Sequence, residues 1–453
     1  MSRTMGCAHS GKFMWLSHTR LSRVPLFQSL LICLLVSASL SAMSDNRVAD
    51  PQRYNGTGRE VMLQGFHWTS YDPVNNGNKH WYRIISENAN VIKNAGFDYV
   101  WFPPPSRSAA ADNSYLPNQW YAFANGYGNK DELKQAVKAL KPTLALCDIV
   151  VNHRCGSATG GADFTNPAFG NVEQNKTAVV AGDECNCGKG RPEEQHNKGE
   201  SCESNNAGRD LDHTNPLVQA KIKDFLRKLK SEIGFAGWRY DQVRGYNGLH
   251  IGTYNDASRP VLSVGEFWDN SAQKVVDWVD ETGGKSMAFD FPTRDALVGA
   301  TMSQDYSRLK TQAGKPPGLI GLWSEMSVTF IENHDTEPVR DGGSKRFPDD
   351  KILQGYVYIL THPGIPCVFW RHFFDQGEEQ KAKIIKLIAI RKNAGITSRS
   401  GMFIEPNTDG KYAAIIDDKV AMKIGPAPWS PPGEGWEVAL DGPDYAVWTK
   451  KGR

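Results

Sequence analysis

The 453-residue sequence lacks an excess of either charge and has almost no long apolar run. Its 52 Lys and Arg nearly balance 50 Asp and Glu, which gives a net charge of +2. A basic nucleic-acid-binding surface is therefore not expected. The one clear apolar run, LFQSLLICLLV at 26–36, is shorter than the ~20 residues that a membrane span needs. With 40% hydrophobic and 23% charged residues, the composition is that of a globular protein.

The apolar run has the flanks of an export signal. Arg20 and Arg23 precede it, and the small residues Ser-Leu-Ser-Ala follow at 39–42. We predict a signal peptide at 1–42 and a secreted, extracellular product without a membrane partner. An uncleaved anchor helix is the alternative.

Cysteine is scarce outside this segment, and four of the remaining six cysteines fall within 155–202. That stretch is rich in Gly, Asn and charged residues, so disulfides in a loop-rich lobe are predicted. A zinc site is the alternative, although Cys-x-Cys lacks the usual spacing of structural zinc motifs. Cys147 and Cys367 lie in apolar runs and are predicted to be buried hydrophobic residues. The four clustered cysteines are Cys155, Cys185, Cys187 and Cys202.

Short strand-like runs alternate with amphipathic helical segments between residues 59 and 392, which is typical of a parallel barrel or a doubly wound sheet. Eight strands favour a (β/α)8 TIM barrel. The predicted strands are Val61–Phe66, Tyr99–Pro103, Leu144–Val151, Phe235–Tyr240, Val261–Gly265, Ser286–Phe291, Met326–Ile331 and Ile365–Trp370. The predicted helices include Trp81–Asn94, Lys130–Leu140, Leu217–Glu232, Gln273–Asp280 and Lys351–Leu360.

The same pattern predicts the domain organisation. The barrel would comprise 43–153 and 210–395, interrupted by an inserted, loop-rich lobe at 154–209 after the third strand. Short alternating runs such as YAAIIDD and KVAMKIG predict a small antiparallel β domain at 396–453.

Ionisable residues cluster where four of the predicted strands end. In an α/β barrel the carboxyl ends of the strands share one face and supply the catalytic groups. Asp241 follows Arg239 on one strand, and that cation would keep the carboxylate ionised. Glu266 is followed by Phe267 and Trp268, an apolar setting that should raise its pKa.

This pair of carboxyl groups fits retaining glycoside hydrolysis, in which one attacks the anomeric carbon and the other protonates the leaving oxygen. Asp241 suits the nucleophile and Glu266 the acid and base. Asp335, between His334 and Thr336, could bind sugar hydroxyls and stabilise the transition state. Each carboxylate alone could be a salt-bridged strand end, but the three together favour a catalytic site.

The segments DIVVNH, GWRYDQVRG, VGEFWD and FIENHD resemble, in order and spacing, the four signature segments of the α-amylase family, glycoside hydrolase family 13. The likeness is greatest to plant-type α-amylases and bacterial maltooligosaccharide-forming amylases, and it covers nearly all of the chain after residue 42. The resemblance implies a starch-hydrolysing enzyme whose partner is an α-glucan.

The resemblance also implies roles for individual residues. Asp241 matches the nucleophile, Glu266 the acid/base and Asp335 the transition-state stabiliser. The matching substrate-binding residues are Arg239, His153, His334 and Tyr115, and Trp68 is predicted as a further sugar contact from its residue type alone. For the two histidines a buried structural role is the alternative. Trp68 and Trp120 could equally be sugar platforms or core aromatic residues.

A structural Ca²⁺ is implied in the same way, held by hard oxygen ligands that tie the lobe to the barrel. Asn152, Asp210 and the Gly245 carbonyl match family ligands, whereas Glu203 is a guess with a solvated carboxylate as the alternative.

The sequence departs from the plant pattern at three places, of which the shortened connection affects the predicted leaving-group subsites. They are Gln242 after the nucleophile, Arg371 and Gln376 in FWRHFFDQG, and a short connection from Trp268 to the next helix. We expect a monomeric, secreted, calcium-dependent α-amylase acting on internal bonds. The alternatives are an exo-acting maltooligosaccharide-forming enzyme, a non-catalytic glucan-binding protein and, least supported, a zinc hydrolase.

Overall fold

The computed structural model describes residues 53–110, 113–156, 161–183, 187–192, 208–337 and 346–451. The predicted signal peptide and Glu203 lie outside these ranges. Residues 52–453 form one compact unit. Among the described residues, no helix is both long enough and apolar enough to cross a membrane.

Eight parallel strands close into a barrel in the order β1-β12-β11-β10-β9-β8-β5-β2, which confirms the predicted TIM barrel. Their side chains are almost all buried, as expected for parallel strands covered by helices. The barrel strands are β1 (Met62–Gln64), β2 (Tyr99–Phe102), β5 (Leu144–Ile149), β8 (Gly237–Tyr240), β9 (Ser263–Gly265), β10 (Met287–Phe289), β11 (Ser327–Phe330) and β12 (Ile365–Phe369).

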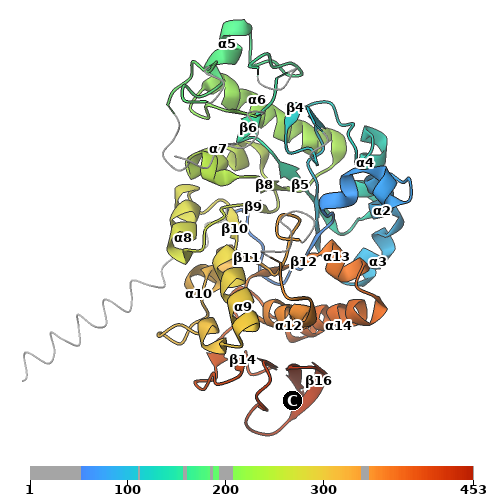
Figure 1. The fold of residues 1–453 in the computed structure, drawn as a ribbon, viewed down its shortest axis with the longest axis vertical. Helices are drawn as coiled ribbons and strands as arrows, with labels where there is room; N and C mark the ends of the chain where they lie inside the picture. The colour runs from blue at the N-terminus through green and yellow to red at the C-terminus, as the bar shows by residue number, and fades with distance from the viewer. Residues whose placement is uncertain are drawn as a thin grey trace, which may run out of the picture. The chain divides into compact units, whose positions relative to one another are not determined.

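Helices surround the barrel (Figure 1), and side chains cap several of them. Asn129 and Glu132 form a capping box on α4, and Asn215 caps α6 ahead of a proline at its first position. The helices are α2 (Trp81–Glu87), α3 (Ala89–Asn94), α4 (Lys130–Ala139), α6 (Pro216–Lys228), α7 (Gly248–Ser258), α8 (Ala272–Glu281), α9 (Phe291–Ser303), α10 (Leu319–Trp323), α12 (Ile352–Thr361), α13 (Trp370–Phe374) and α14 (Glu378–Ala394).

Two predicted helices differ from the structure. The segment Trp81–Asn94 is two helices, because the chain breaks at Asn88, whose side-chain amide donates to the carbonyl of Ile84. The segment Leu217–Glu232 ends its α-helical part at Lys228 and continues as one π-helical turn, Leu229–Ile233.

The described part of the segment between β5 and α6 carries little regular structure. It contains a two-stranded sheet, β6 (His153–Arg154) with β7 (Arg209–Asp210), and the short helix α5 (Val172–Thr177). Arg154 is buried there and donates to the backbone carbonyls of Asn118, Thr165 and Pro167. Its guanidinium also lies 4.6 Å from the centre of the Trp120 ring, which makes Trp120, with no exposed surface, a core residue rather than a sugar platform.

The C-terminal strands form a separate antiparallel sheet in the order β13-β14-β15-β17-β16. Helix α12 packs against β15 and β17 of this sheet. The strands are β13 (Met402–Ile404), β14 (Tyr412–Ile416), β15 (Val420–Ile424), β16 (Trp436–Gly442) and β17 (Tyr445–Lys450). The prediction of a C-terminal antiparallel β domain is confirmed.

Candidate active site

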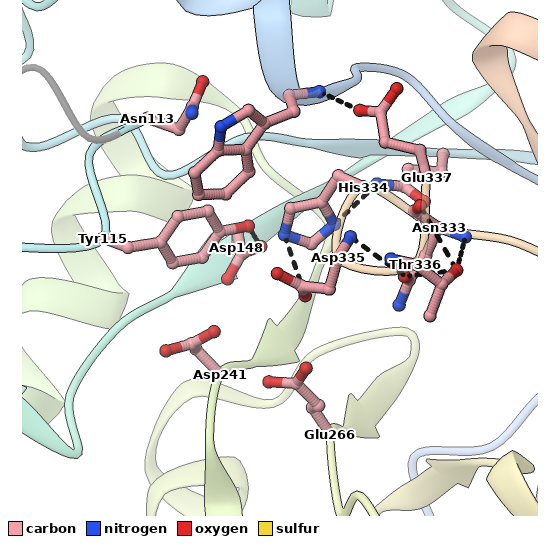
Figure 2. Close-up of polar contacts among 12 residues, drawn as sticks. Asn113, Tyr115, Asp148, Asp241, Glu266, Asn333, His334, Asp335, Thr336 and Glu337 are labelled. Atoms are coloured by element: carbon pink, nitrogen blue, oxygen red, sulfur yellow. Dashed lines mark hydrogen bonds and ion pairs between the residues drawn. The ribbon is translucent and has the colours of Figure 1, made fainter. Parts of the chain in front are cut away.

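Three carboxyl groups meet at the carboxyl ends of the barrel strands. Asp241 directly follows β8, Glu266 directly follows β9, and Asp335 lies in the turn after β11. Asp241 and Glu266 are 7% and 8% exposed, while 20% of the Asp335 side chain is accessible. Figure 2 shows the three side chains projecting toward one another from separate elements. The structure therefore brings together the trio predicted from the sequence.

The buried guanidinium of Arg239 links two of these carboxyl groups. Its Nη1 donates to Asp241 Oδ1 at 2.7 Å and forms an ion pair with Asp148 Oδ1 at 2.9 Å. Its Nη2 lies 2.9 Å from Glu266 Oε2. Burial lowers the pKa of Arg239, but the surrounding carboxylates outweigh burial and raise that pKa well above its usual value. The guanidinium thus stays charged and favours the ionised form of its neighbours.

Glu266 sits where its neutral form is favoured. Burial is the largest cause, and the negative charges of Asp241 and Asp335 add to it, so the pKa of Glu266 is raised well above the usual glutamate value. Arg239 and the backbone N–H of Gln242, which donates to Oε2 at 3.0 Å, oppose this shift without reversing it. Glu266 can therefore hold a proton at a pH where an exposed glutamate would be ionised.

Asp148 belongs to the same network, although no role was predicted for it from the sequence. Its Oδ2 accepts hydrogen bonds from the Tyr115 hydroxyl at 2.9 Å and from Trp101 Nε1 at 3.0 Å. Burial raises the pKa of Asp148 to about 7, against the opposing charge of Arg239. The signal was present in the sequence, because a lone carboxylate within the apolar strand Leu144–Ile149 must be paired.

His334 forms an aromatic stack beside Asp335. Its Nδ1 lies 2.9 Å from Gln64 Nε2, and its Nε2 lies 3.3 Å from Asp335 Oδ2. The Tyr115 ring stacks on it at 5.3 Å and 13°, and the Trp68 ring does so at 6.2 Å and 18°. Figure 2 shows Tyr115 and His334 next to Asp335, and the stacking of Trp68 on His334 adds the third predicted substrate contact to this group.

The turn that carries Asp335 is fixed by Asn333. The Asn333 side-chain oxygen accepts hydrogen bonds from the backbone N–H groups of Asp335 and Thr336, both at 3.0 Å. This local bonding holds a turn in place and fixes where the Asp335 side chain starts.

His153 is placed differently from His334. It lies on β6, and its Nε2 is 2.7 Å from the backbone carbonyl of Tyr115. This bond ties β6 to the segment that carries the stacking tyrosine, so the structure gives His153 a clear positioning contact.

Two of the predicted calcium ligands lie side by side. Asn152 and Asp210 are 2% and 5% exposed, and Asn152 Nδ2 is 3.3 Å from Asp210 Oδ1. The pairing of β6 with β7 brings them together, since Leu211 N also bonds to the Asn152 carbonyl. The described residues contain no group of three or more His, Cys, Asp or Glu side chains arranged to hold a metal ion.

Asp183 is a further buried carboxylate next to this pair, and it was not predicted from the sequence. It accepts from the backbone N–H of Asp210 at 2.8 Å and pairs with Arg209 at 2.6 Å. Gly245 ends a short 3₁₀ turn after Asp241.

The described part of the chain contains three cysteine thiols and one disulfide-bonded cysteine. Cys147 and Cys367 are buried thiols, as predicted. Cys155 is also a buried thiol, which corrects its inclusion among the disulfide cysteines. Cys187 is disulfide-bonded, and both Cys185 and Cys202 lie outside the described residues.

Comparison with known proteins identifies the family of this chain. Residues 393–449 match the model of the α-amylase C-terminal β-sheet domain. The chain is 37% identical over 424 residues to the probable α-amylase 2 of Arabidopsis thaliana, covering 89% of this chain and 97% of that protein. This chain belongs to the α-amylase family. It is accordingly a glycoside hydrolase, and the resemblance drawn from the four segments is confirmed.

Other relatives agree in family and in fold. The chloroplastic α-amylase 3 of A. thaliana is 38% identical over 411 residues, which cover 87% of this chain but only 44% of that longer protein. The crystal structure of an Anoxybacillus α-amylase shares the fold with a TM-score of 0.62 at 15% identity, over 89% of this chain and all of that one.

Proposed function

We propose that this chain is a secreted, calcium-dependent α-amylase that hydrolyses internal α-1,4-glucosidic bonds of starch with retention of configuration. The observation that carries the proposal is the shared guanidinium: Asp241 and Glu266 contact the same Arg239 group from neighbouring strands. Two carboxyl groups held this close suit a double displacement, in which their separation is about 5 Å.

In the first step, Asp241 attacks the anomeric carbon and forms a β-linked glycosyl ester. Arg239 Nη1 donates a hydrogen bond to Asp241 Oδ1 at 2.7 Å, which orients the carboxylate for this attack. Glu266 donates its proton to the leaving glycosidic oxygen, which the raised pKa of this group permits. In the second step the ionised Glu266 takes a proton from water, which attacks the ester and restores the α configuration.

Asp335 would bind the hydroxyl groups of the reacting sugar. Its accessible carboxylate lies 3.3 Å from His334 Nε2, so the pair can offer both an acceptor and a donor to adjacent hydroxyls. The rings of Tyr115 and Trp68 beside His334 supply the apolar face against which a sugar ring packs.

Calcium would be held by the oxygen atoms of Asn152 and Asp210. Both offer hard oxygen ligands and both are buried; Asn152 directly precedes β6, and Asp210 lies on β7, the strand that pairs with β6. Asp183 could add a further carboxylate, and the Gly245 carbonyl is the family's remaining ligand; Glu203 stays a prediction. The ion would supply structural cross-linking rather than chemistry.

Early products decide between endo and exo action. Wild-type enzyme and Asp241→Asn should be incubated in parallel with soluble starch, and products from the first minutes separated by chromatography with the anomeric form read by NMR. A broad mixture of α-configured oligosaccharides from wild type alone supports the proposal. β-Configured products, or equal activity of the variant, would overturn it.

An exo-acting, maltooligosaccharide-forming enzyme is the second candidate. Only residues 266–271 connect β9 to α8, so little chain is available there to shape leaving-group subsites. One dominant short product in the same experiment would favour this candidate.

A further inference from the structure

An ion pair between the part-exposed Arg371 and the buried Glu337 connects the segments that follow three barrel strands, β1, β11 and β12. Glu337, two residues after Asp335, has a side chain only 1% exposed, and Arg371 on α13 reaches it from the end of β12. Arg371 Nε donates to Glu337 Oε2 at 2.5 Å. Arg371 was recognised in the sequence as a departure from the plant pattern, and no part of the proposed mechanism uses either residue.

Both partners also hold the segment after β1. Glu337 Oε1 accepts a hydrogen bond from the backbone N–H of Trp68 at 2.5 Å, which Figure 2 draws as a dashed line. Arg371 Nη2 donates to the hydroxyl of Thr69 at 2.7 Å. The ion pair thus contacts two successive residues of the turn that follows β1.

Trp68 is the residue whose position depends on this grip. Its ring lies nearly parallel to His334, at 6.2 Å, and His334 in turn contacts Asp335. A planar ring can support a sugar only if its height and tilt are fixed. Glu337 connects Trp68 with Asp335, because its carboxylate accepts a hydrogen bond from the Trp68 backbone and its own backbone belongs to the same turn as Asp335.

We propose that Glu337 and Arg371 are positioning residues that hold the Trp68 ring against His334 and so set glucan affinity. The inference rests on the proposed function for its kinetic test. Neither residue touches the reacting atoms, so chemistry should persist when the pair is broken, while sugar binding weakens.

The test is a double-mutant cycle with Glu337→Gln, Arg371→Gln and the double variant, assayed on maltoheptaose. Each single variant should raise KM roughly tenfold with kcat within about twofold, and the double variant should be no worse than the worse single. Arg371→Lys keeps the positive charge but lacks the planar guanidinium, so its KM should lie between those of the wild type and Arg371→Gln. In a Trp68→Ala background, Glu337→Gln should add nothing.

A general structural weakening would act differently. It would reduce the fraction of folded enzyme and so lower the apparent kcat while leaving KM unchanged. Either that result, or effects of the two single variants on KM that add in the double variant, would overturn the inference. Glu325→Gln and Arg399→Gln provide a matched control, since these residues form an ion pair elsewhere in the same unit. Their KM should equal that of the wild type.

A second measurement reads the position of Trp68 without any turnover. In enzyme labelled with 5-fluorotryptophan, the ¹⁹F resonance of Trp68 is identified by its loss in Trp68→Phe. That resonance should shift and broaden in Glu337→Gln and Arg371→Gln but not in the control pair. A Trp68 resonance that does not move in these variants would refute the positioning role. Failure of the wild-type enzyme to cleave starch is a separate outcome, and it would count against the proposed function alone.

Discussion

Replacing Glu266 by glutamine tests the central chemical assignment with little structural disturbance. Glutamine has the same shape, and its carbonyl can still accept the 3.0 Å hydrogen bond from the Gln242 N–H. Because the raised pKa favours the neutral carboxyl in the folded protein, the exchange replaces one neutral group by another. We therefore expect the melting temperature to change little.

Activity should respond very differently, because glutamine cannot donate a proton to the leaving oxygen. Loss of general acid and base catalysis typically costs 10²–10⁴-fold, which corresponds to about 3–5 kcal/mol of transition-state stabilisation. The assay is kcat/KM on soluble starch, with Glu325→Gln as the control that should retain wild-type turnover. Wild-type-like turnover by Glu266→Gln would refute the assignment.

A chemical rescue sharpens this test. A maltooligosaccharide with an activated aryl leaving group needs no protonation, so the variant should still form the glycosyl ester at Asp241. Azide needs no general base and should then restore turnover, giving an α-glycosyl azide. A β-configured azide would contradict retention, and failure of rescue with a folded variant would contradict the second role of Glu266 as base.

Three further predictions concern other parts of the molecule. Asp148→Asn removes a carboxylate that shares Arg239 with Glu266, so the pKa of Glu266 should fall. Because the protonated form of Glu266 is the active one, the alkaline limb of the kcat/KM profile should move to lower pH. An alkaline limb that stays in place or moves to higher pH would contradict the shared guanidinium. A calcium chelator should lower the melting temperature, since an ion present at 100 times its Kd adds about 2.7 kcal/mol to the free energy of unfolding. The Asp210→Asn variant should lose most of this sensitivity to chelator. A wild-type melting temperature that does not change with chelator would count against the site. Lysine in Arg154→Lys cannot reproduce the three hydrogen bonds that Arg154 makes to backbone carbonyls. Limited proteolysis within 155–209 should therefore be faster in the variant than in the wild type. Equal rates would show that the guanidinium does not stabilise the lobe.

The barrel and its catalytic face could be predicted because both depend on local pattern. Buried parallel strands appear as short apolar runs between helical segments, and strand ends such as that before Asp241 mark one face of the barrel. The broken helix at Asn88 and the π-helical turn after Lys228 were missed, because a side-chain bond to the backbone and a local change of hydrogen-bond register leave the hydrophobic pattern unchanged.

The sequence by itself determined the fold class, the family and the three carboxyl groups, since each follows from residues close together along the chain. Only the tertiary structure decided how those groups are tuned and held. Asp148 shares a guanidinium with Asp241, and Glu337 and Arg371 meet across 34 positions of the chain. Such pairings arise from closure of the barrel, which brings distant strand ends within hydrogen-bonding distance, and no pattern in the sequence encodes a distance of that kind.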